Sequence, residues 1–299
     1  MPRPIAAIPS LDAWLQRGTH REQLGHRLFV LDVGPRTAPP LVLLHGFPSA
    51  SYDFWRVLPT LARERRVIVH DHPGLGLSAK PRAYGYSIVE QTAHALALWQ
   101  QLGLTQVDVL AHDYGCSIAT ELMFRRAHRD LPLAVRSFTL VNSGLYYAMA
   151  GLRPVQHLLR LHCTRPLASR LGARWLYKRT MRQLWGTPGA ELDAELDVLW
   201  QMTARDGGKV ALGWVSEYLE ERRVLHTARW NEGIRRLDAP AHVLWGDRDP
   251  VGVPAIALRL HEELPNARLT WLPGVGHYPM LEAPEAFADA ALHFLNGLA

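Results

Sequence analysis

The chain has little cysteine, with Cys116 and Cys163 alone among 299 residues. Two cysteines supply no disulfide framework, which excludes the small disulfide-stapled domains of secreted proteins. No stretch approaches the ~20 consecutive apolar residues of a membrane span, and the amino terminus lacks the apolar region of a signal peptide. No lipidation motif stands at either end. We therefore expect a soluble, cytoplasmic protein.

Signals for nucleic-acid or metal binding are also missing. The sequence has no basic-aromatic stripe and no helix-turn-helix pattern, so we expect no nucleic-acid partner. His70-Asp71-His72 places three metal-type side chains together. Adjacent residues in a turn rarely converge on one ion, however, and no further ligand elsewhere in the sequence is spaced to join them. We expect neither a metal nor another cofactor.

What the sequence does contain is an alternation of short strand-type runs and helical stretches. This alternation indicates an α/β fold with a mostly parallel sheet and helices on both faces. The length fits one α/β domain of roughly 200–250 residues with an insertion. The predicted strands are residues 26–33, 41–44, 66–69, 107–110, 136–141, 241–244 and 268–272, and the clearest core helix is 88–102.

The middle of the chain changes to helical patterns alone, for example at residues 190–203 and 209–223. We predict an α/β core of residues 1–144 and 236–299, with residues 145–235 inserted as a helical lid segment over the carboxyl ends of the strands. Residues 145–236 hold five of the ten tryptophans, and 15 Lys and Arg against 9 Asp and Glu. The excess of positive charge fits either an anionic partner or a solvated exterior, and the second reading is favoured.

Asp113 is the most informative residue. Residues 107–117, Val-Asp-Val-Leu-Ala-His-Asp-Tyr-Gly-Cys-Ser, run from an apolar strand through a tight turn into a helix. This pattern is typical of a nucleophile elbow, which usually presents a serine. A carboxylate that attacks a carbonyl gives an unstable anhydride, whereas one that attacks a saturated carbon gives a stable ester. Asp113 therefore predicts cleavage of carbon–oxygen or carbon–halogen bonds.

Two later segments offer the partners of a catalytic triad. Residues 243–250 form an apolar strand that ends in a turn with two carboxylates, Asp247 and Asp249. Residues 269–279 end a strand in a loop that carries His277. The order nucleophile, acid, histidine along the chain is that of α/β-hydrolases.

Five motifs in this order resemble the epoxide hydrolase and haloalkane dehalogenase branch of the α/β-hydrolases, and four segments resemble the mesoderm-specific transcript proteins within it. The five are His45-Gly-Phe-Pro, Asp71-His-Pro-Gly-Leu-Gly-Leu-Ser-Ala-Lys-Pro, His112-Asp-Tyr-Gly, Gly246-x-x-Asp249 and Gly276-His-Tyr-Pro. The four are Tyr86-Ser-Ile-Val-Glu-Gln, Ala111-His-Asp-Tyr-Gly, Val141-Asn-Ser-Gly and His277-Tyr-Pro-Met-Leu-Glu.

The resemblance implies roles for individual residues. Asp249, rather than Asp247, is expected to face His277, and His277 to activate a water. The backbone amides of Phe47 and Tyr114 are expected to form the oxyanion hole. Small residues at Ala111 and Cys116 stand where the family more often has glycine, and Cys116 is expected to be a packing residue rather than a nucleophile.

The leaving group separates the candidate activities. The resemblance implies that an epoxide oxygen would take its proton from lid tyrosines, first Tyr218 and then Tyr177, with Tyr146 and Tyr147 as replacements. The alternative interpretation of each tyrosine is a packed aromatic side chain without a catalytic role. Dehalogenases commonly hold halide with an indole and an asparagine where this chain has Tyr114 and Phe47.

We thus expect a cofactor-free hydrolase of an apolar or epoxide-bearing small molecule, most simply an epoxide hydrolase. The alternatives are a haloalkane or haloacid dehalogenase, and a catalytically silent protein of the same fold that serves as a binding scaffold. The sequence leaves the substrate and the oligomeric state open.

Overall fold

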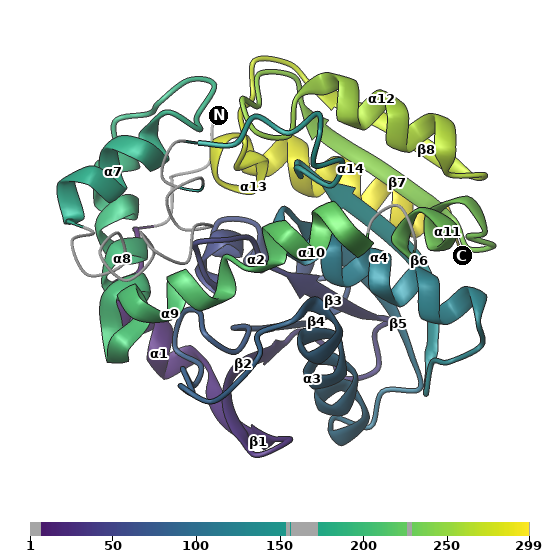
Figure 1. The fold of residues 1–299 in the computed structure, drawn as a ribbon, viewed down its shortest axis with the longest axis horizontal. Helices are drawn as coiled ribbons and strands as arrows, with labels where there is room; N and C mark the ends of the chain where they lie inside the picture. Colours follow the sequence, from purple (N-terminus) through teal and green to yellow (C-terminus); the bar gives the residue numbers. More distant parts are fainter. Residues whose placement is uncertain (1–6, 154–155, 157–172, 226–228, 299) are drawn as a thin grey trace.

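The computed structural model describes residues 7–153, 156, 173–225 and 229–298. In this part of the chain eight strands form a single sheet in the order β1-β2-β4-β3-β5-β6-β7-β8, visible in Figure 1. The strands are β1 (Thr19–Gln23), β2 (His26–Val33), β3 (Pro40–Leu44), β4 (Arg66–His70), β5 (Gln106–His112), β6 (Ala134–Val141), β7 (Ala241–Gly246) and β8 (Ala267–Leu272).

The sheet is mostly parallel, which confirms the predicted fold class. The six strands β3 to β8 run parallel to one another. β2 pairs antiparallel with both β1 and β4. Strand β1 was absent from the prediction. It reads Thr-His-Arg-Glu-Gln and is largely exposed at the edge of the sheet, so it lacks the apolar pattern by which buried strands are recognised.

Helices cover both faces of the sheet. On one face lie α3 (Ile88–Gln101), α4 (Tyr114–Ala127), α11 (Asn231–Arg235) and α12 (Pro254–Glu263), which share one hydrophobic core. On the other lie α1 (Leu11–Arg17), η1 (Ser51–Phe54), α2 (Leu58–Leu61), α13 (Pro279–Glu282) and α14 (Pro284–Asn296), around a second core. Burial of both faces explains the continuous apolar runs of the central strands.

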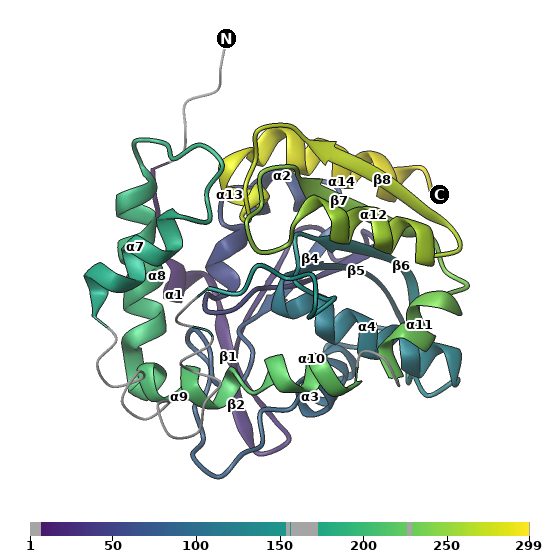
Figure 2. The same cartoon turned by 45° about the horizontal axis from the view of Figure 1, so that its top comes forward.

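The described part of the lid segment is helical and lies between β6 and β7. It contains α7 (Arg174–Arg182), α8 (Leu192–Ala204), η2 (Arg205–Gly207), α9 (Gly208–Val215), α10 (Tyr218–Leu225) and α11. In Figures 1 and 2, α7 and α8 lie side by side at one end of the molecule, and α9 and α10 continue from them toward α4. No helix in the described ranges is long and apolar enough to cross a membrane.

The helix predicted over residues 209–223 is in fact two helices, α9 and α10, separated at Ser216 and Glu217. The Ser216 hydroxyl donates to the Gly213 carbonyl oxygen at 2.8 Å. Serine side chains compete in this way with helical backbone hydrogen bonds. The break matters because it lets α10 take its own direction over the core.

Several polar contacts anchor the lid segment to the core, and two of them lie on opposite sides of it. On one side, Glu195 of α8 accepts from Trp55 Nε1 at 2.9 Å and from Arg56 Nε at 2.7 Å. On the other, Glu221 of α10 accepts from the backbone N–H of Ile88 at 2.7 Å, at the amino end of α3. The helices of the lid segment are therefore tied to fixed points beside the carboxyl ends of the strands.

The turn from β5 into α4 requires glycine at position 115. A Cβ atom there would collide with the backbone carbonyl oxygen of Leu44 in β3, because the first turn of α4 lies directly against that strand. The Gly115 N–H donates to the His45 carbonyl oxygen at 3.1 Å, which joins this turn to the loop after β3.

We predict that Gly115→Ala lowers the free energy of unfolding by about 1–3 kcal/mol, the usual cost of forcing atoms into a packed site. Urea unfolding followed by circular dichroism measures the change. Gly189→Ala is the matched control, since a Cβ at Gly189 would meet open space. Equal stability of the two variants would contradict the close approach of α4 to β3.

Candidate active site

Asp113 stands between β5 and α4 in a backbone conformation that non-glycine residues seldom adopt, with φ 43° and ψ −103°. Such a conformation costs on the order of 1–3 kcal/mol and persists where neighbouring groups enforce it. Here the Asp113 N–H donates to the Val141 carbonyl oxygen at 3.2 Å. The Asp113 carbonyl oxygen accepts from Ser143 Oγ at 2.9 Å and from the Cys116 N–H at 3.1 Å. The side chain is thereby aimed away from the helix axis while remaining 3% exposed.

The loop after β3 reaches the carboxylate of Asp113. The backbone N–H of Phe47 donates to Asp113 Oδ2 at 3.1 Å. Tyr114, the other predicted donor, is the first residue of α4, where the backbone N–H has no partner within the helix. The structure thus brings Phe47 and Asp113 together as the sequence motifs predicted, and places the Tyr114 amide next to them in the chain.

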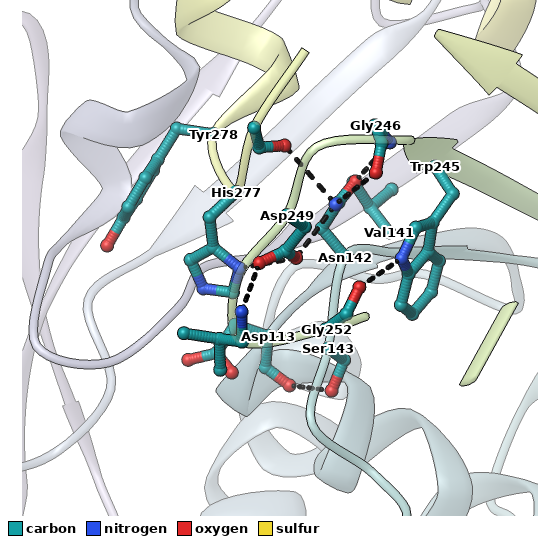
Figure 3. Close-up of polar contacts among 12 residues, drawn as sticks. Asp113, Val141, Asn142, Ser143, Trp245, Gly246, Asp249, Gly252, His277 and Tyr278 are labelled. Atoms are coloured by element: carbon teal, nitrogen blue, oxygen red, sulfur yellow. Dashed lines mark hydrogen bonds and ion pairs between the residues drawn. The ribbon is translucent and has the colours of Figure 1, made fainter. Parts of the chain in front are cut away.

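Asp249 and His277 meet at the ends of β7 and β8. His277 Nδ1 lies 2.7 Å from Asp249 Oδ2. Asn142 Nδ2 donates to the same oxygen at 2.8 Å, and the Val251 N–H donates to Oδ1 at 2.7 Å. Burial opposes ionisation of Asp249, but the positive His277 and these donors outweigh it and hold its pKa below the ordinary value. Figure 3 shows the His277 ring between Asp249 and Asp113.

Asp247, the rival acid, lies elsewhere. It is exposed, and its Oδ1 accepts from the Gly274 N–H at 2.7 Å. Asn142, by contrast, was not predicted as a site residue, although it lies in the quoted Val141-Asn-Ser-Gly motif. Its amide also accepts from the Gly246 N–H at 2.8 Å, so it fixes the turn that carries Asp249. An asparagine directly after a central strand was the available signal.

His277 is positioned to change its charge during a reaction. Burial disfavours its protonated form, but the carboxylates of Asp249 and Asp113 outweigh burial and raise its pKa to about 9. The imidazole is therefore protonated at neutral pH. Neutralisation of the Asp113 side chain would remove one of these negative charges, so the pKa of His277 would fall and the ring would release its proton more readily.

The predicted tyrosines occupy different positions. Tyr177 of α7 lines the same cavity as Asp113 and His277, with its hydroxyl 3.5 Å from Thr203 Oγ1. The Tyr218 ring is 1% exposed and packs 5.5 Å from the Phe47 ring. Tyr218 is outside the residues that line this cavity, but its hydroxyl bonds to Gln156, which does line it.

Tyr146, a possible replacement, lies away from the cavity, because its hydroxyl donates to Glu263 of α12 at 2.6 Å. Tyr147 is only partly buried and packs beside the core on the α4 face of the sheet. Burial raises the pKa of both Tyr177 and Tyr218 above the ordinary value, so each keeps its proton at neutral pH. A phenol in this state can donate a proton to an oxygen that becomes negative.

A cavity of about 120 Å³ lies between the lid segment and the carboxyl ends of the strands. Asp113 and His277 line it from the core. Most of the other walls are apolar, and the polar exceptions come mainly from the lid segment. The apolar walls include Phe47, Pro48, Leu176, Met181, Leu184, Leu212 and Val251, and the polar ones are Arg153, Gln156, Thr180 and Lys209. This composition suits a mainly apolar small molecule.

The remaining histidines near the site are buried and neutral. Burial lowers the pKa of His112 to about 3 and also lowers that of His45. His112 Nε2 bonds to the His277 carbonyl oxygen at 2.8 Å, and His45 Nε2 accepts from the His72 N–H at 3.1 Å. No group of three or more metal-type side chains gathers anywhere in the described residues. Cys116 packs inside the turn, and burial raises its pKa to about 12, which disfavours a thiolate.

Comparison with known proteins bears on the family and the fold of the chain. Residues 39–284 match the family described as alpha/beta hydrolase fold. LipZ of Mycobacterium tuberculosis is 36% identical over 288 residues, covering 96% of this chain and 98% of LipZ. The human mesoderm-specific transcript homolog protein is 32% identical over 302 residues, covering 98% of this chain and 90% of that protein.

Solved structures show the same fold. The haloalkane dehalogenase DbeA from Bradyrhizobium elkani superposes with a TM-score of 0.80 at 21% identity, covering 94% of this chain and 98% of DbeA. The epoxide hydrolase CorEH superposes with a TM-score of 0.78 at 23% identity, covering 94% of this chain and 99% of CorEH. At these identities the likeness concerns the fold alone. The family match and the full-length relatives together establish that this chain belongs to the alpha/beta hydrolase fold family.

Proposed function

We propose that this hydrolase is an epoxide hydrolase that acts through an ester between Asp113 and its substrate. The observation that carries the proposal is the Asp113 carboxylate itself. It stands at the nucleophile position, bonded to the Phe47 N–H and adjacent to a His277–Asp249 pair. A small apolar molecule entering the cavity under the lid segment would meet this carboxylate at its floor.

In the first step, Asp113 Oδ1 attacks one epoxide carbon from the side opposite the carbon–oxygen bond. That bond breaks, the ring opens, and its electron pair goes to the epoxide oxygen. A tyrosine hydroxyl gives this oxygen its proton. Tyr177, which lines the cavity, and Tyr218, whose hydroxyl bonds to Gln156, are the candidate donors. The products are a neutral hydroxyalkyl ester of Asp113 and a tyrosinate, which is reprotonated by the proton that His277 releases once the Asp113 charge is gone.

In the second step, His277 takes a proton from a water, and the resulting hydroxide attacks Cγ of Asp113. Negative charge develops on Oδ2, where the Phe47 N–H already donates and the Tyr114 N–H is the proposed second donor. Collapse breaks the bond between Cγ and the ester oxygen. This oxygen takes the proton of the newly added hydroxyl, so a vicinal diol leaves and Asp113 is again a carboxylate. Asp249 holds the His277 ring and stabilises its protonated form throughout.

Epoxide is favoured over halide by the side chains beside the nucleophile. Tyr114 and Phe47 offer no side-chain N–H to a departing halide. The indole of Trp200, which also lines the cavity, supports a dehalogenase as the second candidate. A panel of alkyl, aryl and carboxylated epoxides beside haloalkanes and haloacetates, assayed for diol and for halide, decides between them. Halide release would move the assignment to a dehalogenase, and no product from either class would favour a binding scaffold.

Replacement of Asp113 by alanine is expected to abolish diol formation and to leave the fold intact. The carboxylate is the proposed nucleophile, and the residue lies at the turn before α4, where alanine makes the same backbone hydrogen bonds. Diol assays and far-ultraviolet circular dichroism check both parts. More than a trace of activity in Asp113→Ala would rule out the ester mechanism.

His277→Gln is expected to trap its substrate, because attack by Asp113 does not require a base but hydrolysis of the ester does. Loss of general-base assistance slows the second step by ~10²–10⁴-fold. Intact-mass spectrometry should show the protein plus one substrate mass, with the adduct on the peptide that contains Asp113. An unmodified mass, where the wild type turns the same epoxide over, would overturn the two-step assignment.

Tyr218→Phe and Tyr177→Phe test the proton donor. Removal of a general acid slows ring opening by ~10²–10⁴-fold, so the variant that lacks the true donor should form the ester more slowly. The rate is measured in a single turnover with enzyme in excess. Tyr146→Phe is the control, since its hydroxyl bonds to Glu263. A tyrosine whose removal leaves this rate unchanged is not the donor.

A further inference from the structure

Arg222 is a buried cation that the lid segment inserts beside the nucleophile. It belongs to α10 and is 1% exposed. Its Nη2 donates to the Asp113 carbonyl oxygen at 2.8 Å and lies 3.7 Å from Asp113 Oδ1. Its Nε donates to Ser117 Oγ at 2.7 Å, in the first turn of α4. One side chain of the lid segment therefore contacts both the backbone and the carboxylate of Asp113.

A guanidinium this deeply buried needs a compensating charge, because an unpaired buried charge is strongly unfavourable. Among the described residues, the carboxylate paired with Arg222 is that of Asp113. The other titratable groups that face Asp113 are His45, His112, Cys116, Tyr218, His277 and Tyr278. Of these, His277 alone is held in a charged form, and it must give up that charge before it can act as a base. Arg222 is thus the permanent positive charge next to the nucleophile.

The two carboxylate oxygens of Asp113 have different neighbours. Oδ2 accepts from the Phe47 N–H, whereas Oδ1 faces Arg222. This division orients the carboxylate, leaving Oδ1 as the attacking oxygen and Oδ2 in the oxyanion hole. The same charge lies beside the bond that breaks last, since Oδ1 becomes the ester oxygen and carries the developing negative charge when the diol leaves.

Arg222 also stacks on a candidate proton donor. Its guanidinium carbon lies 4.6 Å from the centre of the Tyr218 ring, one helical turn earlier in α10. The Tyr218 ring in turn packs 4.9 Å from the ring of Tyr114. The position of α10 over the core therefore determines where both the cation and this tyrosine stand.

We propose that Arg222 is a positioning residue of the reaction: it fixes the strained backbone of Asp113 and holds Oδ1 as the attacking oxygen. The proposal rests on the proposed ester mechanism. It goes beyond the triad and oxyanion hole because it makes the lid segment part of the machinery that orients the nucleophile. A lid that only covered the substrate would contribute no such contact.

The neighbouring residue provides a matched control. Glu221 is also partly buried on α10 and also reaches the core, where it accepts from the Ile88 N–H. It anchors the helix without contacting Asp113. Any effect of an Arg222 variant that comes from loosening α10 should therefore also appear in Glu221→Gln. An effect that comes from the lost contact with Asp113 should be absent from Glu221→Gln.

The first experiment measures ester formation directly in the His277→Gln background, with styrene oxide as the probe and intact-mass spectrometry as the readout. Adding Arg222→Met should slow the appearance of the adduct by about 100-fold, the usual effect of a misplaced reacting group. Arg222→Lys should recover part of the rate, since it keeps the charge but loses the two-pronged geometry. Glu221→Gln should leave the rate unchanged.

The second experiment needs no substrate. A double-mutant cycle of unfolding, with Arg222→Met and Asp113→Asn, should show coupling of at least about tenfold in the unfolding equilibrium constant, as expected for contacting charged residues. The cycle that pairs Glu221→Gln with Asp113→Asn should be additive. If Arg222→Met fails to fold, Arg222→Lys takes its place in both experiments.

The outcomes separate the two proposals. If the His277→Gln protein forms no adduct with any epoxide of the panel, the proposed function is refuted. The role of Arg222 in the attack is refuted as well. The double-mutant cycle would still report whether Arg222 holds Asp113. Coupling in the cycle with an unchanged rate of adduct formation would reduce Arg222 to a structural residue and overturn the proposal. An additive cycle would overturn it independently of any substrate.

Discussion

The strained backbone of Asp113 is the constraint on which the site depends. With φ at 43°, the residue would relax if its neighbours released it. Its contacts come from segments far apart in the sequence: Val141 and Ser143 after β6, Phe47 after β3, and Arg222 in the lid segment. The sheet supplies most of these contacts by bringing the carboxyl ends of β3, β5 and β6 together. The turn is therefore a product of the whole fold.

Four charges of alternating sign cross this site. Asp249, His277 and Asp113 follow β7, β8 and β5, Arg222 belongs to α10, and all four side chains are buried. In this buried site each charge is stabilised by an opposite charge beside it. A reaction that neutralises Asp113 leaves two positive side chains, His277 and Arg222, with one negative one, Asp249. Because arginine keeps its proton, the site returns to balance when His277 loses its proton. The proposed order of steps thus follows from electrostatics as well as from chemistry.

The sequence predicted the features that depend on local pattern. The fold class and the positions of Asp113, Asp249 and His277 follow from strand-turn signals that each residue carries in its own neighbourhood. Strand β1 was missed because its polar sequence has no burial pattern, and the break at Ser216 because one serine decided between one helix and two. Asn142 and Arg222 were missed for another reason. Their importance lies in contacts across more than 75 residues of sequence, which no local pattern encodes.

The anchoring of α10 has a consequence for how such lids can be exchanged. Here Glu221 and Arg222 are consecutive. Glu221 binds the amino end of α3, and Arg222 binds the turn that carries Asp113. A transplanted lid without this pair would leave Ser117, Ser143 and the Asp113 carbonyl oxygen without their guanidinium partner. Core and lid segment are in this sense a co-adapted pair, because a side chain of the insertion completes the hydrogen bonding of a turn in the core.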